Sequence, residues 1–132
     1  MLDISGMNPP QRKAVETLKG PLMIIAGAGT GKTRVITYRI ANLLSKGVKP
    51  GQITAVTFTN KAATEMKERL ASLVSQPIKD INIGTFHSFC LKLLRRFHKA
   101  AGLQKQFNIV GTGDQLDLVQ LITRTNNVKL LL

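Results

Sequence analysis

The sequence has little cysteine, few acidic side chains and no long apolar run. Cys90 is the single cysteine, so no disulfide can form within the chain, and a reducing compartment suits it best. No apolar stretch approaches the roughly 18 residues that a membrane-spanning helix needs. The first residues, Met1-Leu2-Asp3-Ile4, lack the basic start and apolar run of a signal peptide. We therefore expect a cytoplasmic protein without a membrane partner.

The scarcity of acid leaves a strong excess of positive charge. Nineteen Lys and Arg face seven Asp and Glu, which gives a net charge of +12. Such an excess favours a polyanionic partner such as nucleic acid. Apolar residues make up 43% of the 132 residues, which is typical of a folded globular chain. The length fits one small domain, or one domain and the opening of another.

Turn residues and apolar spacing predict alternating strands and helices. Asn8-Pro9 and Gln11 are typical of a capped helix start, and Gly20 of its end. Apolar or β-branched runs predict three strands at 21–26, 53–58 and 81–84, and helical spacing predicts helices at 32–46 and 61–74. Short connections between such elements indicate an α/β fold with a parallel sheet and flanking helices.

After Gly84 the pattern becomes helical. Residues 88–101 form an amphipathic stretch, and Thr112-Gly113-Asp114-Gln115 suggests a capping box for a further helix. We place the domain boundary so that 1–86 form one part and 87–132 the start of a second, helical part. The charged side of the 88–101 helix carries Lys92, Arg95, Arg96 and Lys99, which form either a solvated face or a contact to a DNA backbone.

A glycine-rich loop between the first predicted strand and the following helix predicts a phosphate-binding site. Glycines let successive backbone N–H groups point at one phosphate, and the helix dipole adds positive potential there. The lysine supplies a charge for the β and γ phosphates, and the threonine hydroxyl can bind Mg²⁺. The loop consists of Ala26, Gly27, Ala28, Gly29, Thr30, Gly31, Lys32 and Thr33. Kinases, GTPases and other ATPases share such loops, although a kinase would also need an acceptor site and lid arginines.

Four segments together resemble superfamily 1 DNA helicases of the UvrD/Rep/PcrA type. They are Pro10-Gln11-Arg12-Lys13-Ala14-Val15, the loop that begins with Ala26, Thr57-Phe58-Thr59-Asn60-Lys61-Ala62-Ala63, and Gly84-Thr85-Phe86-His87-Ser88. The resemblance implies an incomplete RecA-like P-loop NTPase sheet, followed by the start of an inserted helical subdomain. It also implies ATP and Mg²⁺ as ligands, with Lys32 and Thr33 in the catalytic site.

The same resemblance assigns binding roles to residues outside the loop. Gln11 should read adenine, and Arg34 should lie near the base or the phosphates. Single-stranded DNA should contact Phe58, Thr59, Asn60, Thr85, Phe86 and His87. Three alternatives stay open: Gln11 as only a helix-capping partner, Phe58 as a buried core aromatic, and His87 as a hydrogen-bonded histidine at the domain boundary.

The sequence lacks one acidic motif that ATP hydrolysis would need. None of the seven acidic residues belongs to an adjacent Asp-Glu pair after an apolar strand, the arrangement that would hold Mg²⁺ and orient the attacking water. By its resemblance to this family, the parent enzyme should be a helicase that moves 3′ to 5′ on single-stranded DNA and opens duplex junctions in repair or replication. By itself this chain should bind nucleotide without unwinding. The alternative is a stand-alone module for nucleotide or single strands.

Overall fold

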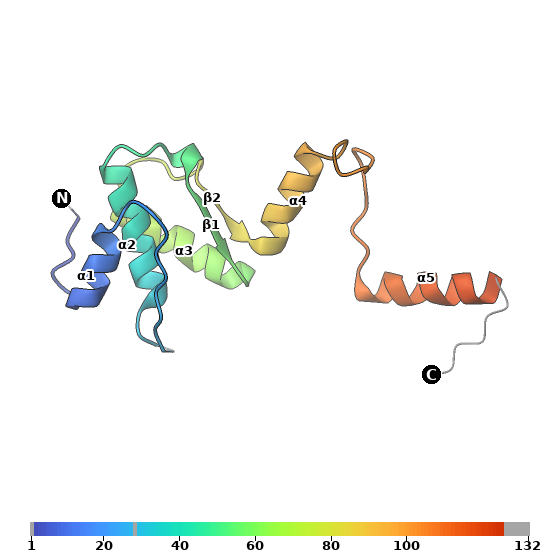
Figure 1. Ribbon diagram of the computed structural model, residues 1–132, viewed down its shortest axis with the longest axis horizontal. Helices are drawn as coiled ribbons and strands as arrows, with labels where there is room; N and C mark the ends of the chain where they lie inside the picture. Colours follow the sequence, from blue (N-terminus) through green and yellow to red (C-terminus); the bar gives the residue numbers. More distant parts are fainter. Residues whose placement is uncertain (1, 28, 126–132) are drawn as a thin grey trace. The chain divides into compact units, whose positions relative to one another are not determined.

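The structure, a computed structural model, describes residues 2–27 and 29–125. The chain divides into two compact units, Met1–Lys92 and Leu93–Leu132. Along the chain the elements are α1 (Pro9–Glu16), α2 (Lys32–Ser45), a short 3-10 helix η1 (Pro50–Gln52), β1 (Thr54–Thr57), α3 (Asn60–Leu73), β2 (Asn82–Thr85), α4 (Phe86–Arg96) and α5 (Thr112–Thr125) (Figure 1).

The sheet consists of β1 and β2, which pair in parallel. The register places Ala55 opposite Ile83 and Thr57 opposite Thr85. Ala55 and Ile83 are both buried, so this pair marks the face of the sheet that turns to the core. The mixed α/β architecture and the parallel pairing agree with the sequence analysis.

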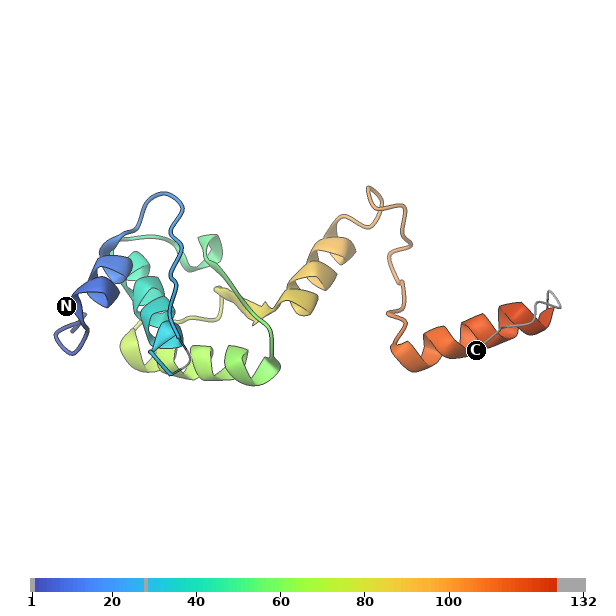
Figure 2. The same ribbon diagram turned by 60° about the horizontal axis from the view of Figure 1, so that its bottom comes forward.

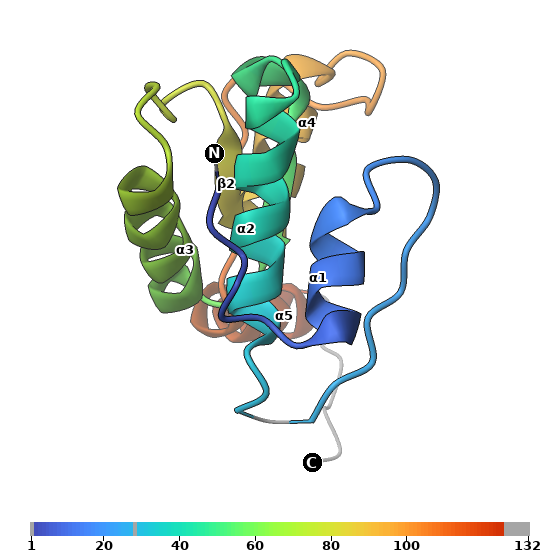
Figure 3. The same cartoon turned by 90° about the vertical axis from the view of Figure 1, so that its left-hand side faces the viewer.

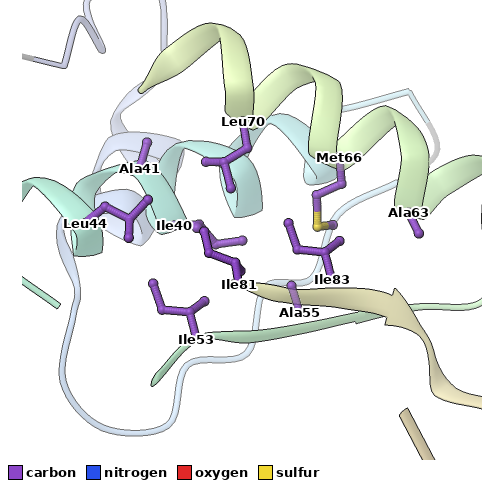
Figure 4. Close-up of a cluster of buried hydrophobic side chains, with 10 residues drawn as sticks. All are labelled: Ile40, Ala41, Leu44, Ile53, Ala55, Ala63, Met66, Leu70, Ile81 and Ile83. Atoms are coloured by element: carbon purple, nitrogen blue, oxygen red, sulfur yellow. The ribbon is translucent and has the colours of Figure 1, made fainter. Parts of the chain in front are cut away.

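The main core lies between this sheet face and helices α2 and α3 (Figure 4). Met66 and Leu70 of α3 and Ile40 of α2 point at the strands, and Leu70 is 0% exposed. These side chains recur every three or four residues, so each helix turns one apolar face to the sheet. A smaller cluster of Met7, Ala14, Val15 and Val35 joins α1 to α2.

The predicted first strand is wrong. Residues 21–26 form no strand, and the side chains of Met23 and Ile25 are 82% and 86% exposed. A strand needs a neighbour for its N–H and C=O groups, and within the described residues β1 and β2 pair only with each other. The apolar composition of the segment predicted a buried strand, but composition alone supplies no pairing partner, and Leu22, Met23, Ile24 and Ile25 are exposed.

Helices α1, α4 and α5 also differ from expectation at their ends. Helix α1 ends at Glu16, because the backbone of Thr17 is extended (φ −75°, ψ 97°); the Thr17 N–H and hydroxyl both donate to the carbonyl of Lys13. Helix α4 begins at Phe86 and ends at Arg96, so it starts earlier than expected and stops short of residue 101. Before α5, the Gly111 N–H donates to the carboxylate of Asp114 at 2.9 Å, so the cap lies one residue before the expected box.

The second unit contains the end of α4 and the whole of α5. Among its described residues, 93–125, no side chain is buried. The apolar residues of α5 include Leu116, Leu121 and Ile122, which are 57%, 61% and 58% exposed. In the part of the chain that the structure describes, no helix combines the length and apolarity needed to cross a membrane.

Candidate functional site

The glycine-rich loop connects residues 21–26 to the first turn of α2, and it lies at the foot of α2 beside α1 (Figure 3). Gly29 and Gly31 have φ angles of +74° and +83°, a left-handed conformation that residues with a Cβ rarely adopt. Gly31 caps α2, and among the described residues no side chain accepts a hydrogen bond from the N–H groups of the first turn. N–H groups without a side-chain cap from the described residues therefore meet the positive end of the helix dipole at this loop. Ala28, a predicted phosphate contact, lies outside the described residues.

The side chains of the loop fold back onto loop carbonyls. The Lys32 ammonium donates to the carbonyl of Ala26 at 2.9 Å and also to that of Gly27. The Thr30 hydroxyl donates to the Gly27 carbonyl at 2.7 Å. The positive charge of Lys32 thus sits within the bend of the loop, which places it next to the uncapped helix end.

Thr33 follows in the first turn of α2 and is partly buried. Its carbonyl accepts a 2.7 Å hydrogen bond from the hydroxyl of Thr37, a side chain that is only 1% exposed. The Thr33 hydroxyl makes no hydrogen bond with the described residues, so it keeps its lone pairs for a ligand. Sequence analysis missed Thr37, although a threonine four residues after a loop threonine can bond the i−4 carbonyl.

Gln11 uses both ends of its carboxamide. Its Oε1 accepts a hydrogen bond from the Asn8 backbone N–H at 3.1 Å. The backbone N–H of Gln11 donates to Asn8 Oδ1 at 3.0 Å, which completes a capping box. Its Nε2 donates to the Thr30 carbonyl at 3.1 Å. Capping is therefore part of the role of Gln11 but not its only contact, because the same side chain reaches the loop.

A cavity of about 270 Å³ lies between α1, residues 24–26 and the loop. It is lined by Asn8, Pro10, Gln11, Ala14, Ile24, Ile25, Ala26, Thr30, Lys32 and Val35. Its walls combine apolar side chains with the Gln11 carboxamide and the Lys32 ammonium, a combination of many apolar and few polar groups that is typical of small-molecule sites. A larger hollow of about 640 Å³ lies along α5, and none of the predicted site residues lines it.

Arg34 is not among the residues that line this cavity. Its guanidinium carbon lies 5.5 Å from the centroid of the Tyr38 ring, and a Cβ on Gly6 would lie 3.3 Å from its Nη2. The Ser5 N–H donates to the Asp3 carboxylate, and this bond lowers the pKa of Asp3, with the charge of Arg34 as a smaller cause in the same direction. The structure thus places the Arg34 guanidinium with the N-terminal segment, and no hydrogen bond joins it to the described loop residues.

The predicted contacts beyond the loop gather where β1 and β2 end, because parallel strands present their carboxyl ends at one edge. The rings of Phe58 and Phe86 lie 5.4 Å apart between centroids and are tilted by 49°. Phe58 is 88% exposed, so the alternative of a buried core aromatic is wrong. Phe86 is 45% exposed, and together the two rings form an aromatic surface at this edge.

The polar residues at the same edge differ in what they already bind. Thr59 caps α3 by accepting from the Ala62 N–H at 3.1 Å, and Asn60 is the exposed first residue of that helix. Thr85 is 8% exposed, and its hydroxyl accepts from the Ser88 N–H at 3.2 Å. His87 is exposed and makes no hydrogen bond with the described residues, so the alternative of a hydrogen-bonded histidine does not hold.

Two of the basic side chains of α4 contact other residues of the chain. The Lys92 ammonium donates to Asn82 Oδ1 of β2 at 2.8 Å. The Arg96 guanidinium lies 5.5 Å from the centroid of the Phe97 ring. Across residues 2–27 and 29–125, no cluster of three or more His, Cys, Asp or Glu side chains is placed to hold a metal ion.

Helices α1 and α2 lie side by side (Figure 2 and Figure 3). Two polar side chains of α2, to which the sequence analysis gave no role, donate hydrogen bonds to α1. Arg39 Nη1 donates to the Ala14 carbonyl at 2.8 Å, and Asn42 Nδ2 donates to the Val15 carbonyl at 3.1 Å. No sequence pattern signals these contacts, because they depend on how the two helices lie side by side.

Comparison with known proteins assigns most of the chain to one family. The family model described as the UvrD/REP helicase N-terminal domain matches residues 7–131. The ATP-dependent DNA helicase PcrA of Bacillus subtilis (strain 168) is 50% identical over 126 residues, which cover 95% of this chain and 17% of that protein. PcrA of Leuconostoc citreum is 48% identical over 126 residues, covering 94% of this chain and 17% of the relative. The chain thus spans 17% of the length of these curated relatives.

Proposed function

The chain belongs to the UvrD/REP helicase family, and on this premise we propose that it is the ATP-binding N-terminal segment of a DNA helicase. The parent enzyme would couple ATP hydrolysis to 3′ to 5′ movement on single-stranded DNA and to the opening of duplex junctions. Residues 1–86 would form part of a RecA-like P-loop domain, and residues 87–132 the start of a helical subdomain.

The observation that carries the nucleotide proposal is the uncapped start of α2. Gly31 in the left-handed conformation leaves the first N–H groups of the helix without a side-chain cap, and Lys32 lies in the same bend. Such an end binds anions through its N–H groups and its dipole. When the triphosphate enters, the Lys32 ammonium exchanges the carbonyls of Ala26 and Gly27 for the β and γ phosphate oxygens.

The donor set also fits a magnesium ion at the phosphates. The Thr33 hydroxyl faces no competing hydrogen bond from the described residues, and Thr37 holds the Thr33 carbonyl in the helix. A hydroxyl with phosphate oxygens and water is the kind of oxygen set that Mg²⁺ takes. Bound there, Mg²⁺ would neutralise charge on the phosphates. Gln11 would then read the adenine edge from the cavity beside the loop.

Lys32→Ala tests this proposal by calorimetric titration of ATP with Mg²⁺. We expect saturable binding in the wild type and a loss of at least about tenfold in affinity in the variant, because one charge-assisted contact is worth about 1.5–3 kcal/mol. Lys46→Ala is the matched control, since Lys46 is exposed at the opposite end of the same helix. Equal ATP binding by Lys32→Ala and wild type would contradict the proposal.

Hydrolysis should need residues that this sequence does not contain. Its acids include no adjacent Asp-Glu pair to hold Mg²⁺ and orient water, and the loss of such groups costs orders of magnitude in rate. We expect the 132-residue chain to release no phosphate from ATP above background. A turnover that depends on Lys32 would contradict this.

The edge formed by the ends of β1 and β2 is the proposed contact for single-stranded DNA. The exposed rings of Phe58 and Phe86 offer stacking surfaces for bases, and the exposed Asn60 and His87 offer polar groups for the backbone. Thr59 and Thr85 would act mainly by shaping this edge, since their hydroxyls already accept hydrogen bonds from helix N–H groups.

A further inference from the structure

Helix α1 is short and owes its end to side chains from another helix. It has eight residues, and isolated helices of that length are marginal in water. The last carbonyls of a helix have no partner within it. Here Arg39 satisfies the carbonyl of Ala14 at 2.8 Å, and Asn42 satisfies that of Val15 at 3.1 Å. The positive charge of Arg39 also lies at the negative end of the α1 dipole.

These two bonds hold α1 in a defined position along α2. The apolar cluster between the helices, which includes Val15 and Val35, favours contact but sets no direction, because hydrophobic burial is non-directional. The hydrogen bonds of Arg39 and Asn42 each need one carbonyl at one distance, so they fix how far α1 slides and how it turns. The Ser45 hydroxyl lies 3.3 Å from Asn42 Oδ1, an arrangement that orients the Asn42 carboxamide with its nitrogen toward α1.

The position of α1 matters because Gln11 lies at its other end. Gln11 Nε2 donates to the Thr30 carbonyl at 3.1 Å, and Thr30 lies two residues before the start of α2 at Lys32. The same helix α2 therefore carries the phosphate-binding lysine at its start and the anchors of α1 two to three turns later. One rigid element thus sets the separation between the group proposed to read the base and the group proposed to hold the phosphates.

We propose that Arg39 and Asn42 are positioning residues for adenine recognition, acting through α1 on Gln11. The inference rests on the proposed function of Gln11 and Lys32 and adds a specificity role for two residues that contact no nucleotide. Without these two hydrogen bonds, α1 can slide along its apolar contact with α2, and Gln11 then no longer lies at the position of the base. The phosphate site at the start of α2 does not change.

Comparing ATP with inorganic tripolyphosphate separates positioning from general stability. Tripolyphosphate engages the loop and the start of α2 but offers nothing to Gln11. A variant that only weakens the fold lowers the affinity for both probes by the same factor, whereas a positioning residue lowers the affinity for ATP alone. GTP provides a second readout, since its base presents a different pattern of donors and acceptors from adenine.

The test uses the 132-residue chain with Arg39→Met, which keeps most of the aliphatic part of the side chain, and Asn42→Leu, which keeps its size; both remove the hydrogen-bond donor. We expect ATP to bind about tenfold more weakly to each variant, with a tripolyphosphate affinity within about twofold of wild type, because one misplaced hydrogen bond is worth about that factor. The preference for ATP over GTP should fall with the ATP affinity. Arg39→Lys, which keeps a donor, should restore most of the loss.

Three comparisons make the result decisive. Arg69→Met is the matched control, because Arg69 is exposed on α3 and should leave both probes unchanged. Gln11→Ala should show the same selective loss of ATP; if it keeps the wild-type preference for ATP over GTP, the proposed role of Gln11 is wrong and the inference falls with it. If Gln11→Ala shows the loss while the anchor variants bind ATP normally, the anchoring inference alone is wrong. Equal weakening of both probes, or loss of helical circular dichroism in both anchor variants, would leave only a structural role and overturn it.

Discussion

Replacing Phe58 with alanine should separate DNA binding from folding. The Phe58 ring is 88% exposed and belongs to neither buried cluster, and its aromatic neighbour is Phe86 at 5.4 Å. Little apolar area is therefore lost from the core, and the free energy of unfolding should change by less than about 1 kcal/mol. The melting temperature of the variant should stay within a few degrees of wild type.

The effect on single-stranded DNA should be much larger. Stacking of one base on an aromatic side chain contributes about 1–3 kcal/mol, which corresponds to a dissociation constant roughly 5 to 150 times higher in the variant. The slope of affinity against salt should not change, because alanine removes no charge. Lys61→Ala, at an exposed position in the first turn of α3, should by contrast change the salt dependence. It should reduce the slope by about 0.7 if Lys61 contacts one phosphate.

Fluorescence anisotropy of a labelled oligothymidylate, titrated at several salt concentrations, measures both quantities. Phe58→Tyr keeps the stacking face and should bind like wild type, whereas Phe58→Leu keeps an apolar side chain without a π surface and should lose most of the affinity that alanine loses. The Phe58 and Phe86 variants combined should lose less than the sum of the single losses if one base spans both rings. Wild-type affinity in a folded Phe58→Ala variant would refute the stacking argument.

Three further substitutions test the structure that supports the site. Leu70→Ala removes a fully buried side chain between α3 and the sheet, and urea unfolding should show a loss of about 2–5 kcal/mol; a loss below 1 kcal/mol would speak against this core. Gly84→Ala would place a Cβ 2.5 Å from the Ser88 hydroxyl, so it should lower the melting temperature in wild type and cost clearly less in a Ser88→Ala background. Thr37→Val removes the bond to the Thr33 carbonyl while keeping the shape, which should cost about 1 kcal/mol in the same unfolding assay, and an unchanged midpoint would contradict the contact.

Local signals in the sequence predicted the helices well. Asn8 and Pro9 mark the start of α1, and both partners of the expected capping box are in place. In α3, the spacing of Ala63, Met66 and Leu70 predicted the face that the structure buries. Such features depend on neighbours three or four residues apart, so a single sequence contains all the information that they need.

Features that depend on partners far away in the chain could not be predicted in the same way. Residues 21–26 have the composition of a strand, but pairing needs a second backbone alongside, and none of the described residues provides it. The contacts of Arg39 and Asn42 with α1 span 25 and 27 residues. The direction of Arg34 follows from Tyr38 and the N-terminal segment, whereas the resemblance to helicases suggested only a place near the nucleotide.

Gln11 shows how a local signal and a functional one can belong to the same side chain. Its Oε1 is bound to the Asn8 N–H and its Nε2 to the Thr30 carbonyl, so an adenine edge would have to replace bonds that already exist. A hydrogen bond contributes a net of about 0.5–1.5 kcal/mol, so the base should add at most about tenfold in affinity, less than the phosphates at Lys32. Its contribution would lie in selectivity: a base that cannot match the carboxamide leaves Gln11 on Thr30, and the loop then keeps the arrangement that it has without nucleotide. In the proposed helicase, recognition of adenine would therefore be linked to the conformation of the phosphate-binding loop through a single side chain.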